Sequence, residues 1–471
     1  MQKKIRLFIS ISVPLLLLLI PRSSIPLEGL SMVEHRMIAI LAMATLFWIL
    51  ESIPIFATSV LIIGVELVAI SDRGFILFRQ GSGSPEFGTL LNYQSIMATF
   101  ASPIIMLFMG GFFLAMAATK YRLDINLARI LLRPFGSNPK YILLGLIAIT
   151  GLLSMFMSNT ATTAMMLAIL TPVLSALDAE DTGRTAFVLA IPFAANIGGI
   201  GTPIGTPPNA VALKYLIGAN SVSFSQWMAF SVPYALVMLI LVWLLLWKLY
   251  PVQVSRISVD IQDRFLTNGK AVIVYVTSAG TILLWLTDFL HGMNEYIVAM
   301  IPVVVFTVTR IITPADLKRL SWDVLWLVAG GIALGLGLEK TGLSKLLVES
   351  IPFGAFSPYV ILVIATAVAI LMSTLTSNTA TANLLLPLVA ALGSTLPVLK
   401  AVGGDRALII SVAMSCSLAM ALPISTPPNA MSHATGMVES KQMVRAGAII
   451  GVVGLFGIYL LVAMLKKMGF L

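Results

Sequence analysis

The chain has 471 residues, of which 58% are hydrophobic and 10% are charged, and its formal net charge is +9. A soluble domain carries about 25% charged residues, so this composition excludes a soluble protein and predicts an all-α polytopic membrane protein. The basic excess is interpreted as membrane topology, because no soluble basic domain that could bind nucleic acid is present. The single cysteine, Cys416, excludes a disulfide framework.

Eleven apolar runs are long enough, or nearly so, to cross a lipid bilayer as helices. The first run follows a basic N-terminus and lacks a clear small-residue cleavage site, so we expect a retained helix. The distribution of Lys and Arg favours a cytoplasmic N-terminus in a cell (plasma or inner) membrane. The eleven runs cover residues 7–21, 36–54, 55–70, 103–119, 185–205, 229–247, 271–289, 295–312, 323–338, 406–424 and 446–465.

Two further apolar runs, 141–174 and 359–393, each carry Ser-Asn-Thr near the middle, at 158–160 and 377–379. Each run is long enough for two short helices that fold back on each other, and too long for a single span. The sequence therefore predicts two re-entrant helical hairpins, each with Ser-Asn-Thr at its tip. The predicted hairpins cover about 138–175 and about 358–395.

The segment Thr-Pro-Pro-Asn-Ala also occurs twice inside apolar sequence, at 206–210 and at 426–430. A proline pair removes backbone donors and clashes with the preceding turn, so it interrupts a helix. Unwound backbone at membrane depth is tolerated only where it lines a cavity or is buried in protein. The predicted broken helices cover about 185–218 and about 406–437.

The spacing of these landmarks indicates an internal duplication. The two Ser-Asn-Thr segments are 219 residues apart, the two Thr-Pro-Pro-Asn segments 220, and the Gly-Gly pairs that begin at Gly110 and Gly330 also 220. Each unit holds five crossing helices if its hairpin enters and leaves on one side, and an odd number inverts the second copy. We assign the Gly-Gly pairs to helix packing. The expected units are an N-terminal helix (1–35), repeat 1 (36–250), a cytoplasmic linker (251–270) and repeat 2 (271–471).

Both hairpin tips and both helix breaks are expected to deliver polar groups to one central place. Freed N–H groups at helix N-termini suit an anion, and freed carbonyls can coordinate a cation. A single polar tripeptide in a membrane helix more often forms hydrogen bonds between helices. A single proline pair more often produces only a kink. Two copies of each in register favour paired ligand-binding segments. Inverted repeats with broken helices are the architecture of secondary transporters, so we predict a transporter and not an enzyme.

These segments, together with Ile-Leu-Glu-Ser-Ile-Pro-Ile-Phe-Ala-Thr-Ser at 49–59, resemble the divalent anion/sodium symporters over nearly the whole chain. The resemblance implies eleven membrane helices, two re-entrant hairpins, a homodimer and an elevator mechanism. It also implies transport of dicarboxylate anions such as succinate, malate, fumarate or 2-oxoglutarate, with citrate and sulfate left open. The expected substrate-binding residues are Ser158, Asn159, Thr160, Ser377, Asn378, Thr379, Thr206, Pro207, Thr426 and Pro427.

The sodium-coupled members of this family bind cations beside the substrate, and no other cofactor is expected. Carried over by position, one cation site would comprise Ser154, Ser158, Asn159 and Gly205. The other would comprise Ser373, Thr376, Asn378 and Ser425.

Two basic residues follow the helix breaks, Lys214 in repeat 1 and His433 in repeat 2. We hypothesise that they substitute for the cations that a dianion at membrane depth requires. In a carrier with fixed positive charge, the empty binding site would move across the membrane only at a high cost in free energy, because its charge would be uncompensated. Such a carrier would exchange one dicarboxylate for another. The alternatives are that Lys214 snorkels toward an interface and that His433 is an ordinary polar core residue. Exchange and sodium symport both stay open, with a slight preference for exchange.

Other functional classes lack their required residues. His35, His291 and His433 form no metal-binding motif, and a channel would need a continuous polar lining. A cation/proton antiporter is a closer rival, because it also uses broken helices. It normally requires a buried carboxylate near the breaks, and Glu51 is the nearest candidate within the spans.

Overall fold

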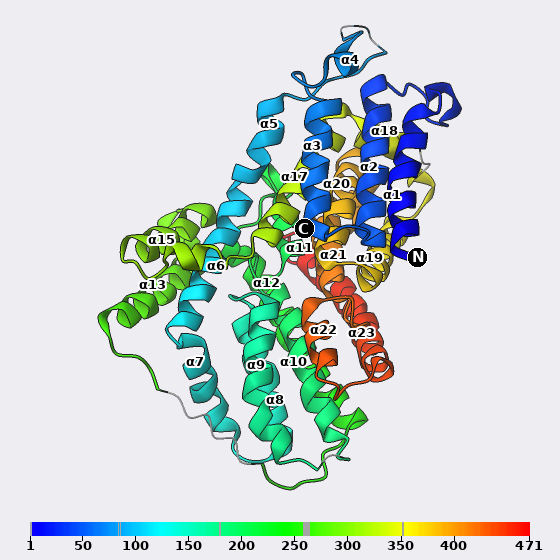
Figure 1. Ribbon diagram of the computed structural model, residues 1–471. Coiled ribbons are helices and arrows are strands. Elements are labelled where there is room, and N and C mark those ends of the chain that lie inside the picture. The colour runs from blue at the N-terminus through cyan, green and yellow to red at the C-terminus, as the bar shows by residue number, and fades with distance from the viewer. Residues whose placement is uncertain (1, 83, 85, 179, 258–263, 351–352) are drawn as a thin grey trace.

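The computed structural model describes residues 2–471 except 83, 85, 179, 258–263 and 351–352, and its regular elements are helices (Figure 1). This confirms the all-helical fold. Residues 258–263 of the expected linker lie outside the described residues. Eight helices in the described part of the chain are long and apolar enough to cross a membrane, and others, such as α3 and α15, are apolar but shorter.

Each of the eleven expected spans coincides with one helix. The helices are α1 (Gln2–Leu19), α2 (Met32–Leu50), α3 (Ile55–Ala69), α6 (Pro103–Lys120), α10 (Gly183–Ile200), α12 (Phe224–Leu249), α13 (Gly269–Leu286), α15 (Glu295–Val308), α17 (Trp322–Thr341), α21 (Gly404–Ser417) and α23 (Ser440–Lys467).

A pair of helices surrounds each Ser-Asn-Thr segment, and in both pairs the serine is the N-cap of the second helix. The Ser158 hydroxyl accepts a hydrogen bond from the backbone N–H of Ala161 at 3.2 Å, which is the usual way to satisfy a helix N-terminus. The arm α19 has 18 residues and is long enough to span a membrane by itself, longer than a short hairpin arm requires. The arms are α8 (Pro139–Ser154), α9 (Asn159–Ser175), α19 (Pro358–Leu375) and α20 (Asn378–Thr395).

The two Pro-Pro-Asn segments begin new helices after a break, α11 (Pro207–Leu213) after α10 and α22 (Pro427–Ala434) after α21. The asparagine of each segment folds back over the break. Asn209 Nδ2 donates to the carbonyls of Gly199, Ile200 and Thr202 at 2.8–3.1 Å. Asn429 Nδ2 donates to Met420 at 2.8 Å and Leu422 at 3.0 Å. These carbonyls have lost their helical partners, so the asparagines supply the missing donors.

The Gly-Gly pairs allow close helix packing, which is the role expected for them from the sequence. A Cβ on Gly110 would lie 2.8 Å from the Cβ of Ala299, so α6 and α15 meet at nearly backbone contact. A Cβ on Gly330 would lie 2.5 Å from the Cα of Ser59, so α17 meets α3 in the same way. Each Gly-Gly pair therefore packs a helix of one half of the chain against a helix of the other half.

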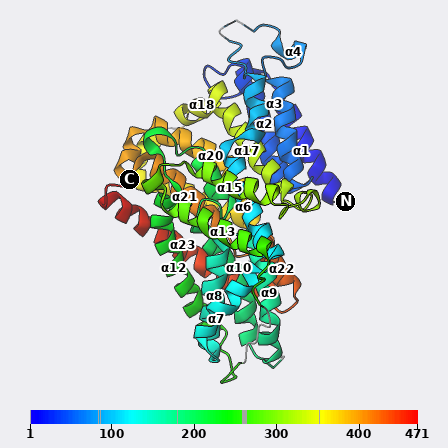
Figure 2. The same cartoon turned by 90° about the vertical axis from the view of Figure 1, so that its left-hand side faces the viewer.

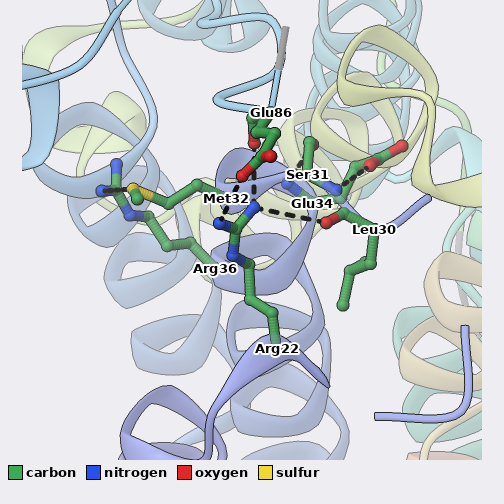
Figure 3. Close-up of polar contacts among 7 residues, drawn as sticks. All are labelled: Arg22, Leu30, Ser31, Met32, Glu34, Arg36 and Glu86. Carbon is green, nitrogen blue, oxygen red and sulfur yellow. Dashed lines mark hydrogen bonds and ion pairs between the residues drawn. The ribbon is translucent and has the colours of Figure 1, made fainter. Parts of the chain in front are cut away.

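The N-terminal end of α2 is tied to the loop that precedes α5 (Figure 3). Ser31 and Glu34 form a capping box, with bonds of 3.3 Å and 2.8 Å between side chain and backbone. Arg22 donates to the Glu86 carbonyl at 3.0 Å and pairs with its carboxylate at 3.3 Å. A cap of this kind contributes about 0.5–2 kcal/mol to stability.

The remaining helices are short and connect the spans. In Figures 1 and 2, α1, α2 and α3 stand together toward one end of the molecule, and α8, α9 and α10 toward the other. The connecting helices are α4 (Ile76–Arg79), α5 (Tyr93–Met97), α7 (Leu123–Leu132), α14 (Asp288–His291), α16 (Pro314–Leu317) and α18 (Leu343–Ser350).

A glycine substitution tests the packing of the first hairpin against α10. A Cβ on Gly198 would lie 2.5 Å from the Cα of Gly151 in α8, where only backbone could give way. We expect Gly198→Ala to destabilise the protein by about 1–3 kcal/mol, the usual effect of overpacking. The thermal unfolding midpoint of the purified protein measures this. Gly64→Ala is the matched control, since nothing lies within 4 Å of that Cβ. Equal midpoints for the two variants would contradict the packing.

Candidate functional site

A cavity of about 740 Å³ lies where both hairpin tips and both helix breaks meet. One side is formed by the N-terminal ends of α9, α11, α20 and α22, so residues from both halves of the chain share it. All ten residues expected to bind substrate line this cavity. They are Ser158, Asn159, Thr160, Thr206, Pro207, Ser377, Asn378, Thr379, Thr426 and Pro427.

The hairpin tips present backbone donors. The helices α9 and α20 begin at Asn159 and Asn378, and the first N–H groups of a helix have no partner within it. The aligned peptide dipoles add partial positive charge at these ends. The threonine hydroxyls of Thr160 and Thr379 stand in the same first turns. Each tip can therefore hold one carboxylate with neutral donors.

The helix breaks present mainly acceptors, for a reason that lies in their sequence. Prolines occupy the first two positions of α11 and α22 and have no N–H to donate. The preceding residues, Thr206 and Thr426, adopt almost the same extended backbone, with φ of −144° in both and ψ of 142° and 150°. Gly205 and Ser425, just before them, also line the cavity. These carbonyl and hydroxyl oxygens are ligands suited to a small hard cation.

Behind each tip, a buried serine donates to the tip asparagine. Ser154 Oγ donates to Asn159 Oδ1 at 2.6 Å, and Ser373 Oγ to Asn378 Oδ1 at 2.7 Å. Both serines are fully buried. The two bonds occupy equivalent places in the two halves, so the internal symmetry extends to side-chain contacts.

The other two residues of the expected cation sites are also hydrogen-bonded near the second tip. Thr376 Oγ1 lies 2.9 Å from Thr381 Oγ1, and Ser425 Oγ donates to the Thr374 carbonyl at 2.7 Å. In the first half, Thr202 Oγ1 donates to the Met155 carbonyl. A hydroxyl of the break thus holds the turn of the hairpin in each half.

The Asn159 side chain satisfies its hydrogen bonds when its amide is turned round. Nδ2 then donates to the carbonyls of Ala195 and Gly205, each 3.1 Å away, and to Ser154 Oγ at 2.6 Å. These oxygens then have a donor, so they do not by themselves indicate a cation.

Another wall of the cavity comes from other helices and is mainly apolar, although the acids Glu51 and Asp323 are also part of it. It is formed by Ile55 and Phe56 of α3, Phe108 and Phe112 of α6, and Leu327 of α17. Polar and apolar walls thus belong to different groups of helices.

Charged side chains are scarce in this cavity. Among the described residues that line it, only Glu51 and Asp323 carry charge, and both are exposed acids. No basic residue is among them. A bound dianion would therefore depend on helix termini, amides and ions from solution for its positive counter-charge.

A second cavity of about 410 Å³ adjoins the first and shares Phe112, Ser158 and Ser321 with it. It contains Lys120, Asp316 and Arg319. Lys120 pairs with Asp316 at 2.5 Å. Burial would raise the pKa of Asp316, but hydrogen bonds from Lys120 and Thr313 outweigh this effect and lower the pKa to about 2. The second cavity is therefore lined by charged side chains where it meets α16.

Lys214 and His433 lie elsewhere, outside the lining of both cavities. Lys214 Nζ donates to the Ile332 carbonyl of α17 at 2.7 Å, and His433 Nδ1 lies 2.8 Å from the Val438 carbonyl. The structure therefore does not bring these two residues together with the residues expected to bind substrate.

Asn196 of α10 lines the cavity and was missed by the sequence analysis. It is buried, and its Nδ2 donates to Thr426 Oγ1 at 3.1 Å and Asn429 Oδ1 at 3.2 Å. It therefore ties the first broken helix to the second break. The only sequence signal was an amide within an apolar span. The position 220 residues after Asn196 is occupied by Cys416, so the duplication did not mark Asn196 as a site residue.

The amino-acid sequence resembles known membrane transporters along nearly its whole length. The family profile described as the sodium:sulfate symporter transmembrane region matches residues 1–469. The sodium-dependent dicarboxylate transporter SdcS of Staphylococcus saprophyticus is 31% identical over 454 residues, covering 88% of this chain and 83% of that protein. SdcS of Staphylococcus aureus (strain bovine RF122 / ET3-1) is 31% identical over 487 residues, covering 95% and 88%.

A solved structure resembles the fold at low sequence similarity. The YdaH transporter of Alcanivorax borkumensis has a TM-score of 0.57 and 13% identity, covering 91% of this chain and 98% of that chain. That likeness concerns the fold alone. The profile match over nearly the whole chain, with relatives of similar length, establishes the family. The chain belongs to the sodium:sulfate symporter family, and it is a multi-pass membrane transporter and not an enzyme.

Proposed function

We propose that the protein is a sodium-coupled transporter of C4 and C5 dicarboxylates such as succinate, malate, fumarate and 2-oxoglutarate. The observation that carries this proposal is the cavity itself. It has two equivalent donor tips for two carboxylates and no basic side chain among its described lining residues. The positive charge that a dianion needs at membrane depth must then come with the ions that bind beside it.

Two donor tips favour a substrate with an anionic group at each end. Neutral asparagine, threonine and backbone donors hold a carboxylate without the strong bidentate grip of an arginine, so the cargo can also leave. A monocarboxylate would leave one tip unpaired, with a buried donor that costs free energy. Citrate and sulfate are the alternative substrates. Inhibition of labelled succinate uptake by each unlabelled anion would rank their affinities.

Two sodium sites are proposed beside the tips. The first comprises Ser154, Ser158, Asn159 and Gly205, and its support is that Ser158, Asn159 and Gly205 line the cavity and that the buried Ser154 contacts Asn159. The second comprises Ser373, Thr376, Asn378 and Ser425. Sodium would supply charge compensation there. The dependence of SdcS on sodium, which its name states, supports the same assignment.

Exchange of dicarboxylates is the alternative, and its basis in this chain is weaker than the sequence suggested. Lys214 and His433 were to provide fixed positive charge at the site. Since neither lines the cavity, that support is absent. Flux experiments separate the two mechanisms directly.

An elevator movement is the proposed mechanism. The polar wall comes from the hairpins and broken helices, whereas the apolar wall comes from α3, α6 and α17. The hairpins and broken helices form the moving unit of this proposal, and the helices of the apolar wall form the fixed unit. We further propose a homodimer in the cell membrane with a cytoplasmic N-terminus, because a dimer would hold the fixed units against the bilayer. The oligomeric mass in lipid nanodiscs tests it.

The tip asparagines should control binding of substrate. Asn159→Leu and Asn378→Leu each remove donors to one carboxylate, a loss of about 1.5–3 kcal/mol, or roughly tenfold to 150-fold in affinity. Uptake of labelled succinate into proteoliposomes measures the effect. Asn138→Ser is the control, because Asn138 caps α8 far along the chain from the tip and serine keeps the cap. Full uptake by either leucine variant would refute the paired site.

Sodium dependence should follow the proposed cation sites. Replacement of sodium by choline outside the vesicles should abolish uptake into empty proteoliposomes, since the dianion then lacks its counter-charge. Ser154→Ala and Ser373→Ala should raise the sodium concentration needed for half-maximal uptake. Uptake that ignores sodium and instead requires dicarboxylate inside the vesicles would establish exchange.

A further inference from the structure

The second cavity carries basic side chains, which the described lining of the main cavity lacks. Lys120, Asp316 and Arg319 line the second cavity, so its described lining has one more base than acid. The main cavity has the two acids Glu51 and Asp323 instead. The positive charge nearest to the hairpin tips along these cavity walls therefore lies in the second cavity.

Asp316 neutralises Lys120 and is occupied by other groups as well. Its Oδ2 accepts hydrogen bonds from Lys120 Nζ at 2.5 Å, from the Thr313 N–H at 2.8 Å and from Thr313 Oγ1 at 2.7 Å. The Lys120 ammonium also donates to the Ile311 carbonyl at 2.8 Å. Because this pair is closed on itself, the net positive charge of the cavity lies on Arg319.

Arg319 is exposed, and no described residue forms an ion pair or a side-chain hydrogen bond with it. An exposed arginine without a partner is common on protein surfaces, so its position is what distinguishes it. The preceding residue, Lys318, is also exposed but lines neither cavity. Arg319 lines a cavity, and a guanidinium donates two parallel hydrogen bonds to a carboxylate.

A short stretch of chain leads from Arg319 to the main cavity. Arg319 lines the second cavity, Ser321 lines both cavities, and Asp323 lines the main one. Ser158 at the first hairpin tip also lines both. Its oxygen accepts the N–H of Ala161, so its hydroxyl hydrogen remains to be donated to an anion. A carboxylate at Arg319 would thus be next to hydroxyl groups that continue to the tips.

The strength of such a contact suits a site from which an anion moves on. An exposed ion pair changes affinity by up to about fivefold, and salt screens it. It would concentrate an anion beside the tips without retaining it. Selection among dicarboxylates would remain with the two tips, which meet both ends of the substrate.

We propose that the second cavity is a separate anion-binding site, in which Arg319 binds one carboxylate of the substrate next to the main cavity. The site binds weakly, needs no sodium, and selects negative charge and not a particular carbon chain. The choice of a dicarboxylate as its occupant rests on the proposed function, whereas its preference for anions does not.

A cysteine at position 161 reports the charge of this cavity. Ala161 is exposed and lines the second cavity but not the main one, so Ala161→Cys is a small change there. The chain's own Cys416 is buried and does not compete for reagents. In the purified protein, reaction with sulfonatoethyl methanethiosulfonate, an anion, is compared with reaction with the neutral hydroxyethyl reagent. The ratio of the two rates cancels differences in accessibility.

Arg319→Gln, added to Ala161→Cys, should lower the anionic-to-neutral ratio about two- to fivefold, the scale of one exposed ion pair. Arg319→Lys should keep most of the ratio, because it keeps the charge. Lys318→Gln is the matched control and should leave the ratio unchanged, since that lysine lines neither cavity. A high concentration of choline chloride should remove the difference between the variants by screening.

Succinate should occupy the same place. In sodium-free choline buffer at constant ionic strength, millimolar succinate should slow the reaction of position 161 with the neutral reagent. This protection should be lost in Arg319→Gln and kept in Lys318→Gln. Succinamide has a similar size and no charge, so it should not protect.

Three results would overturn the proposal. The first is an equal anionic-to-neutral ratio with and without Arg319. The second is an equal loss of the ratio in Lys318→Gln, which would reduce the effect to general surface charge. The third is the absence of reaction at position 161 with either reagent, because the cavity would then admit no small ion from solvent. Protection by succinate that persists in Arg319→Gln would also contradict it, since the anion would then bind elsewhere.

Thermal stabilisation by succinate in the presence of sodium separates this proposal from the proposed function. It reports binding at the main cavity and should be the same in wild type and in Arg319→Gln. Its absence in wild type would refute the proposed function, and the reagent ratios would still decide whether the second cavity attracts anions. Normal stabilisation together with equal reagent ratios would refute the second site alone.

Discussion

The structure depends on how unwound backbone is satisfied inside a membrane protein. Each break frees carbonyls that lipid cannot solvate, and an unsatisfied group there costs several kcal/mol. The amides of Asn209 and Asn429 fold back to bond these carbonyls. Trp227 of α12 also donates to the Ile200 carbonyl, and Ser231 of α12 bonds one more, at Gly201.

The same backbone chemistry divides the cavity between anion and cation. The hairpin tips begin helices at asparagine and threonine, so they offer N–H groups. The breaks begin helices at two prolines, so they offer oxygens. Because tips and breaks line one cavity, an anion and its counter-ions would be neighbours. Substrate and sodium would then stabilise each other's binding, which is the thermodynamic requirement for coupling.

The sequence predicted which residues meet at the cavity better than it predicted the groups around them. Ser-Asn-Thr and Thr-Pro-Pro-Asn were recognisable because each occurs twice at one offset, and all ten expected residues line the cavity. Lys214 and His433 were misleading, because distance along the chain from a break does not fix the direction of a side chain on the short helix that follows. Asn196 had no repeated partner, so its contact with Thr426 and Asn429 emerged only from the fold.

The most direct test of this account is a structure of the protein in lipid nanodiscs, determined by electron cryomicroscopy with succinate and sodium bound. The account predicts one substrate density between Asn159 and Asn378, with each carboxylate at one tip and a cation density beside the Asn159 amide. Substrate density at one tip alone, or beside Lys214 and away from both asparagines, would contradict it.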